Sequence, residues 1–124
     1  MGGYVLPLFH PERCLLLGRL SPKEEFTKDF PKDVDVIFWI YRNVDASLLD
    51  GMLKIHKTMT DNIIFAGGAW KWHGFSPNNR HSEKTSLVQF SEIKHHHIKE
   101  LLLTAWSNNG SLASIYSCMP IAQL

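Results

Sequence analysis

The sequence predicts an α/β fold of parallel strands joined by crossover helices, because strand and helix patterns alternate along it. The strand patterns are short, nearly continuous apolar runs rich in β-branched residues, as expected of strands covered on both faces. The first two are each followed by a stretch whose apolar residues recur at three- and four-residue steps, which is typical of an amphipathic helix. All three also end near a tryptophan and a polar loop.

The first strand and helix are predicted over residues 33–42 and 45–59. The strand contains the apolar run 36–41, and Asp45 is placed to act as the N-cap of the helix. The apolar face predicted for this helix consists of Leu48, Leu49, Met52, Leu53, His56 and Met59.

The same order then repeats. A second strand is predicted over 63–66 and leads into Gly67 and Gly68, and a third over 100–105. The helix between them is predicted over 82–97, and helical spacing returns in 111–124 until Pro120. The face predicted to be buried in the 82–97 helix consists of Leu87, Phe90, Ile93 and His97.

The spacing of the units fits a closed barrel as well as an open sheet. Trp70 follows Trp39 by 31 residues, and Trp106 follows Trp70 by 36. A (β/α)8 TIM barrel of about 250 residues averages roughly 31 per unit, so residues 30–124 are predicted to form about three units of a partial barrel. A doubly wound sheet has the same alternation, and periodicity alone leaves both folds open. Residues 1–29, interrupted by prolines, are predicted to be an irregular N-terminal segment.

Composition excludes several classes of function. The 124 residues include 13 Lys and Arg against 12 Asp and Glu, a net charge of +1, so no nucleic-acid or anionic-membrane partner is expected. Cys14 and Cys118 fit neither a disulfide framework nor a metal motif and are predicted to be buried thiols. No cofactor or bound metal is expected, and the lack of a signal or membrane-spanning pattern leads to a cytoplasmic prediction.

The candidate site lies at the carboxyl ends of the predicted strands, where ligands bind in β/α folds. All four tryptophans of the chain fall there. Aromatic rings and amides together can cover the apolar faces of a sugar ring and hydrogen-bond its hydroxyls, although plain packing is an alternative for each ring alone. The predicted substrate-binding residues are Trp39, Tyr41, Trp70, Trp72, Trp106, Asn108 and Asn109.

Three segments carry a resemblance to a known family. Residues 65–77, FAGGAWKWHGFSP, are similar to the Phe-Ala-Gly-Gly-x-Trp-x-Trp-x-Gly-Phe-x-Pro segment of glycoside hydrolase family 20, the β-N-acetylhexosaminidases. Residues 38–41, FWIY, resemble its Tyr-Trp-Asp-Tyr strand end, and residues 104–110, TAWSNNG, resemble its Trp-Gly-Asp-Asp-Gly turn. The resemblance extends over 30–124 and is closest to the intracellular-type branch; residues 1–29 match nothing.

The resemblance implies the C-terminal portion of a (β/α)8 barrel that removes terminal N-acetylglucosamine or N-acetylgalactosamine from glycans. In that family the substrate's own acetamido group attacks the anomeric carbon, while a Glu protonates the leaving oxygen and an adjacent Asp orients the acetamido group. This chain contains no Asp-Glu dipeptide. Acidic family positions are occupied by Ile40, Asn108, Asn109 and Leu112. The chain alone is therefore expected to have no catalytic residues. A non-catalytic N-acetylhexosamine-binding module and a degenerate structural remnant are the alternatives.

Two further features suggest binding partners. His95, His96 and His97 could hold a metal, but consecutive helical positions point in different directions, which favours structural or solvated histidines. Lys71, His73 and Arg80 flank the second loop and could meet a ligand.

The apolar strands at 34–41 and 101–105 would be the unpaired edges of a three-stranded sheet. Such edges predict a homo-oligomer, pairing with a missing N-terminal barrel portion, or a marginally stable monomer, unless residues 4–8 or 14–17 add a strand.

Overall fold

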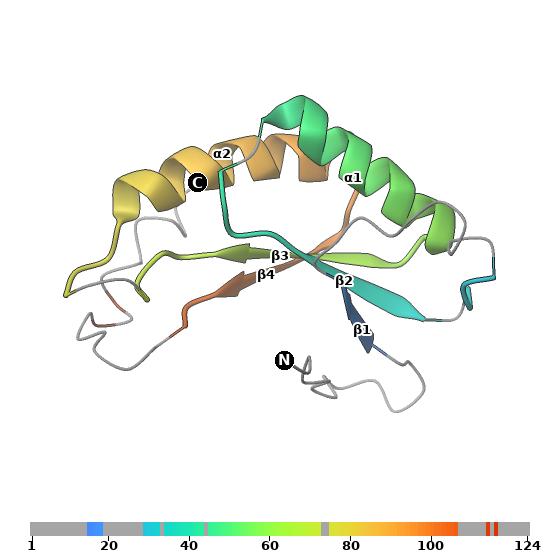
Figure 1. Cartoon of the computed structure of the whole chain (residues 1–124), viewed down its shortest axis with the longest axis horizontal. Coiled ribbons are helices and arrows are strands. Elements are labelled where there is room, and N and C mark those ends of the chain that lie inside the picture. The colour runs from blue at the N-terminus through green and yellow to red at the C-terminus, as the bar shows by residue number, and fades with distance from the viewer. Residues whose placement is uncertain are drawn as a thin grey trace.

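A computed structural model describes residues 15–18 (backbone only), 29–32, 34–43, 45–72, 75–106, 114 and 116. Two helices and four strands make up this part of the chain (Figure 1). In chain order they are β1 (Leu15–Gly18), β2 (Asp35–Trp39), α1 (Ala46–Met59), β3 (Ile63–Gly68), α2 (Asn79–His95) and β4 (Glu100–Thr104). Within these residues, neither helix combines the length and the apolarity needed to cross a bilayer.

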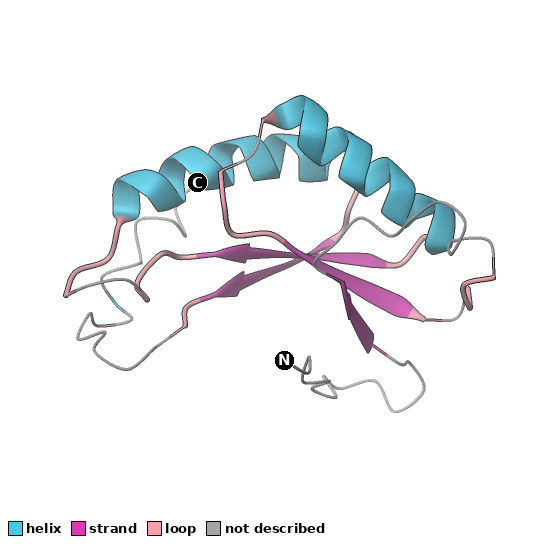
Figure 2. Cartoon of the chain, viewed as in Figure 1, coloured by secondary structure: helices cyan, strands magenta, loops and turns pink. Residues whose placement is uncertain are grey.

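The four strands form one parallel sheet in the order β1-β2-β3-β4. Val36 pairs with Ile63, and Phe65 pairs with Leu101, so neighbouring strands run in step. Both helices lie on the same face of this sheet (Figure 2). A doubly wound sheet reverses its strand order and carries helices on both faces; neither feature occurs in the part of the chain that the structure describes.

The predicted α/β fold with parallel strands and crossover helices is confirmed. β2, β3 and β4 fall within or overlap the predicted strand ranges, and the two helices occupy the predicted positions. β1 lies inside residues 1–29, which were expected to be irregular, and pairs with β2. The apolar run 14–17, considered above as an added strand, therefore contributes most of β1, and β2 is not an edge strand. The helix expected over 111–124 lies outside the described residues, apart from positions 114 and 116.

The main hydrophobic core lies between the sheet and the two helices. Phe38 of β2 and Phe65 of β3 are fully buried and meet edge to face, with ring centroids 5.6 Å apart. Leu49 and Leu53 of α1, both fully buried, pack on them, and Ile93 of α2 completes the cluster. Burial of each such side chain contributes roughly 1.5–3 kcal/mol to folding. This layer fixes both helices on the sheet.

Helix α1 begins where the sequence predicts. The Asp45 carboxylate accepts a hydrogen bond from the Leu48 amide at 2.8 Å and one from the Ser47 hydroxyl at 2.8 Å. The Leu48 bond first, and then the Ser47 bond, hold the pKa of Asp45 below its ordinary value. Asp45 is therefore an ionised N-cap at neutral pH.

Helix α2 buries a different face from the one predicted. Leu87 is 54% exposed and His97 is exposed, so both were wrongly assigned to the core; Ile93 is buried and Phe90 half-buried. The buried face consists mainly of polar residues, namely Ser82, Thr85, Ser86 and Gln89. These side chains are short or hydrogen-bonded: the Gln89 amide donates to the Ile40 carbonyl at 2.9 Å. A cross-element hydrogen bond therefore joins α2 to the end of β2, where periodicity had suggested apolar contact alone.

A buried histidine lies in the layer beneath α1. His56 is 1% exposed, its ring centroid lies 4.6 Å from that of Phe38, and its Nδ1–H donates to the Met52 carbonyl at 2.8 Å. Burial lowers the pKa of His56, and the hydrogen bond to Met52 opposes this shift only in part. The neutral ring is the form that the folded protein accommodates.

We therefore expect stability to depend on pH through His56. Its contribution is fully present above the ordinary histidine pKa of about 6.5 and is lost as pH falls through that value toward the lower folded pKa, because the unfolded chain then binds a proton that the folded chain does not. The free energy of unfolding, measured in urea between pH 8 and pH 5 (a window spanning about 6.5), should decline more steeply for the unmodified chain than for His56→Leu. Parallel pH profiles for the two proteins would contradict this.

Candidate functional site

Aromatic side chains from three successive strands converge at the carboxyl end of the sheet. Tyr41, just beyond β2, lies at their centre. Its ring centroid is 5.9 Å from that of Trp39, 5.3 Å from that of Trp72 and 6.5 Å from that of Trp106. Trp70 joins the group through Trp72, at 4.9 Å. We call Trp39, Tyr41, Trp70, Trp72 and Trp106 the aromatic cluster.

Hydrogen bonds and a ring contact hold Trp70 in place. Its indole N–H donates to the Tyr41 carbonyl at 2.7 Å, which ties the end of β3 to the end of β2. Its backbone N–H donates to the Ser82 hydroxyl at 2.8 Å, and its carbonyl accepts from the Asn78 amide at 2.7 Å. His81 packs edge-on against its ring at 4.3 Å. These contacts give Trp70 a positioning role within the cluster.

Gly68 creates the space in which the cluster packs. A Cβ atom at this position would lie 2.7 Å from Cη2 of Trp72 and 2.8 Å from Cδ1 of Tyr41, closer than carbon atoms approach in folded proteins. Both rings therefore rest directly on the backbone of β3. Sequence reasoning placed Gly68 directly after the second predicted strand but missed this function. Only the pairing register of β2 with β3 shows that residue 41 lies opposite residue 68.

The cluster retains polar atoms without protein partners. Within the described residues, Trp39 Nε1 and Tyr41 Oη are enclosed and make no hydrogen bond. Enclosed donors of this kind are usually satisfied by a partner, so each is a point where an ordered water can bind and bridge to a ligand. Trp106 is 47% exposed and offers a ring face to solvent. Ring surface and free donors thus occur together in one cluster.

The remaining candidates are distributed around this cluster. Lys71 is 3% exposed, immediately after Trp70, while Arg80 is exposed in the first turn of α2. Asn108, Asn109 and His73 lie outside the described residues.

The carboxylates described near the sheet either lie far from the aromatic cluster or cap a helix. Asp35 and Glu100 begin β2 and β4, at the end of the strands opposite the aromatic cluster. Asp45 follows β2 on the same side as the cluster, but it caps α1. The geometry therefore supports binding through rings and donors, and it does not assemble an acid and a base beside them in the described part of the chain.

A pocket opens at the opposite, amino-terminal end of the strands. Its walls carry charges of both signs. Acidic and basic residues that line it are Asp35, Asp61, Glu100, Lys57 and Lys99. In β/α folds this end of the strands generally serves stability, and ligands bind at the other end.

Comparisons with known proteins identify no relative: no family model matches the chain, and no curated protein matches it.

We expect the substitution Gly68→Ala to disrupt the aromatic cluster. The added methyl group must displace the rings of Tyr41 and Trp72, and overpacking of this kind costs about 1–3 kcal/mol. The urea midpoint should fall and the tryptophan emission should change. Gly67→Ala is the matched control, because the tightest contact of a Cβ there is the end of the Gln89 side chain of α2 at 3.1 Å, and its other neighbours, Leu103 and Phe65, lie at an ordinary 3.9 Å. Its emission should stay unchanged, and an unaltered Gly68→Ala protein would contradict the role assigned to Gly68.

Proposed function

We propose that this chain is the C-terminal portion of a family 20 glycoside hydrolase barrel, and that its aromatic cluster binds N-acetylhexosamine. One observation carries the proposal: rings that follow three successive parallel strands converge on Tyr41. The sequential strand order, with both helices on one face, is the arrangement expected of an arc of a (β/α)8 barrel. The similarity of residues 65–77 to the family segment supplies the class of sugar.

The cluster suits an amphipathic ring with polar edges. Aromatic faces cover the C–H faces of a sugar, while donors at their edges meet its hydroxyl and acetamido oxygens. Trp106 supplies the exposed face, and Trp39 Nε1 and Tyr41 Oη supply the donors. Tyr41 is held in position by the Trp70 indole, which bonds its carbonyl. In this proposal Trp70 and Gly68 shape the site, and the other rings contact the sugar.

Catalysis by the chain alone is not part of the proposal. The reaction of the family needs an acid to protonate the leaving oxygen and a carboxylate to orient the acetamido group. The chain has no Asp-Glu dipeptide, and Ile40, next to the cluster, is an apolar residue buried in the helix-facing core. At the positions matched to the family segments, this chain therefore has the aromatic side chains and lacks the carboxylates.

The first test is hydrolysis. The purified chain should release no nitrophenol from a nitrophenyl N-acetyl-β-glucosaminide above the rate in buffer, because no group in the described part of the chain is placed to protonate the leaving oxygen. Far-ultraviolet circular dichroism of the same sample confirms that the helices are present. Turnover that grows in proportion to protein concentration and survives repurification would overturn the claim of inactivity.

The second test is binding. N-acetylglucosamine should quench or shift the tryptophan emission in a saturable way, and glucose, which lacks the acetamido group, should do so more weakly. Trp106→Ala should weaken the affinity about threefold to tenfold, as expected for loss of one ring contact. Leu87→Ala, on the exposed face of α2, is the matched control and should bind as the unmodified chain does. If the tryptophan emission does not change up to tens of millimolar sugar, the rings of the cluster only pack against one another and the binding proposal is rejected.

A further inference from the structure

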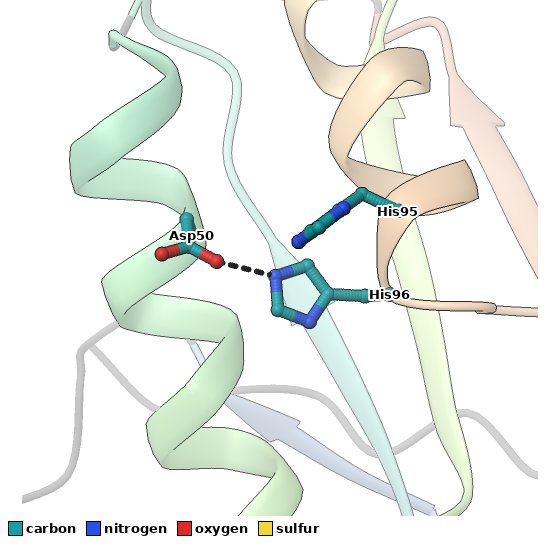
Figure 3. A group of neighbouring side chains, drawn as sticks. All are labelled: Asp50, His95 and His96. Carbon is teal, nitrogen blue, oxygen red and sulfur yellow. Dashed lines mark hydrogen bonds and ion pairs between the residues drawn. The ribbon is translucent and has the colours of Figure 1, made fainter.

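Two helices meet at a group of metal-binding side chains that the proposed function does not use. Asp50 lies in the middle of α1, and His95 and His96 lie at the end of α2. His96 Nε2 is 2.9 Å from Asp50 Oδ1, and one potential ligand atom from each of the three residues lies within 4.8 Å of the others. Figure 3 shows the three side chains directed toward one another across the gap between the helices.

The two histidines lie where α2 ends. His95 is the last helical residue, and His97 adopts a left-handed conformation with φ 53°. The His97 amide donates to the Lys94 carbonyl at 3.1 Å, and the Ile98 amide donates to the Ile93 carbonyl at 3.0 Å. This pair of bonds is a Schellman motif, which ends the helix and reverses the chain. His96 is therefore the cap, and its ring and that of His95 lie 5.1 Å apart at 90°.

The position of His96 is fixed on both sides. Its side chain is buried, its carbonyl accepts a hydrogen bond from the Lys57 ammonium of α1, and its ring bonds Asp50. His95, by contrast, is exposed and free to rotate toward the pair. Asp50 is oriented through its second oxygen, which accepts from Lys54 at 2.7 Å. Two ligands are thus held in place, and the third can reach them.

These donors match the chemistry of zinc and neighbouring divalent metals. Two imidazole nitrogens and one carboxylate oxygen form a set found in zinc sites, with a fourth position left for water. The Glu92 carboxylate, 4.0 Å from His96 Nε2, is close enough to accept a hydrogen bond from such a water. The hydrogen bond between Lys54 and Asp50 is of the kind that orients a ligating carboxylate.

We propose that Asp50, His95 and His96 form a binding site for a zinc-class divalent cation that links α1 to the end of α2. In a tetrahedral site with bonds of about 2.05 Å, ligand atoms lie about 3.3 Å apart. The contact between Asp50 and His96 is already near that distance, and rotation of the exposed His95 ring closes the rest. Coordination through His96 Nε2 requires the tautomer that carries the ring proton on Nδ1, so the proton that Nε2 donates to Asp50 is released to solvent and Nδ1 takes up a proton in its place.

The test uses the full, untagged chain, freed of metal with a chelator and titrated with Zn²⁺ by calorimetry. Both cysteines are first replaced, Cys14→Ser and Cys118→Ser, because thiolates bind zinc strongly and would mask a weaker site. One ion should bind per chain and raise the melting temperature, as expected for a ligand specific to the folded state. Co²⁺ should give the visible absorption of a tetrahedral nitrogen and oxygen site.

Variants decide whether the ion occupies this site. His95→Asn and Asp50→Asn should each weaken Zn²⁺ affinity at least about tenfold, as loss of one of three protein ligands predicts. His95 is exposed, so its replacement leaves the core unchanged and serves even if an Asp50 variant is unstable. His97→Asn is the matched control: it removes a neighbouring exposed histidine and keeps a residue that tolerates the left-handed conformation. The proposal would be overturned by absence of binding, by an affinity in either ligand variant equal to that of the parent chain, or by a weakening in His97→Asn equal to that in the ligand variants.

Discussion

The arrangement depends on one constraint: every described crossover places its helix on the same face of a parallel sheet. Crossovers between parallel strands are almost always right-handed, so strands that pair in sequential order receive their helices on one side. The two faces consequently differ. Phe38 and Phe65 meet α1 and α2 on the covered face. The carboxyl ends of β2, β3 and β4 share one edge, and the aromatic residues that follow them can meet there.

Much of this fold follows from local patterns. The strand runs at 36–41 and 63–66 are apolar, and each of their residues is buried or half-buried, so continuous hydrophobicity was a sound signal. The buried face of helix α2 was harder to predict. Its buried face carries Ser82 and Gln89, which reach hydrogen-bond partners on other elements, and a pattern that counts only apolar residues selects Leu87 instead. β1 spans only four residues, too few to distinguish a strand from an extended loop in sequence.

The rings of the aromatic cluster could be selected from the sequence, but their organisation could not. Position at the strand ends was enough to select the rings of the cluster. The role of Gly68 and the central place of Tyr41 depend on register and on the path of the chain beyond β3, which no local pattern encodes. The histidines show the opposite case: consecutive positions were expected to point in different directions, whereas the His95 and His96 side chains both approach Asp50 at the end of α2.

The hydrogen bond between the Asn78 amide and the Trp70 carbonyl has a consequence for the evolution of this surface. It joins the two ends of the segment 71–77, so the chain leaves the sheet and returns to α2 at nearly the same point. The entropy of closing a loop grows only with the logarithm of its length, and doubling the loop costs about 0.6 kcal/mol. Insertions between Phe75, which is exposed, and Asn78 should therefore be tolerated with little strain on either element. The part of this segment that follows Trp72 can thus vary in length while the stem that positions Trp70 stays the same.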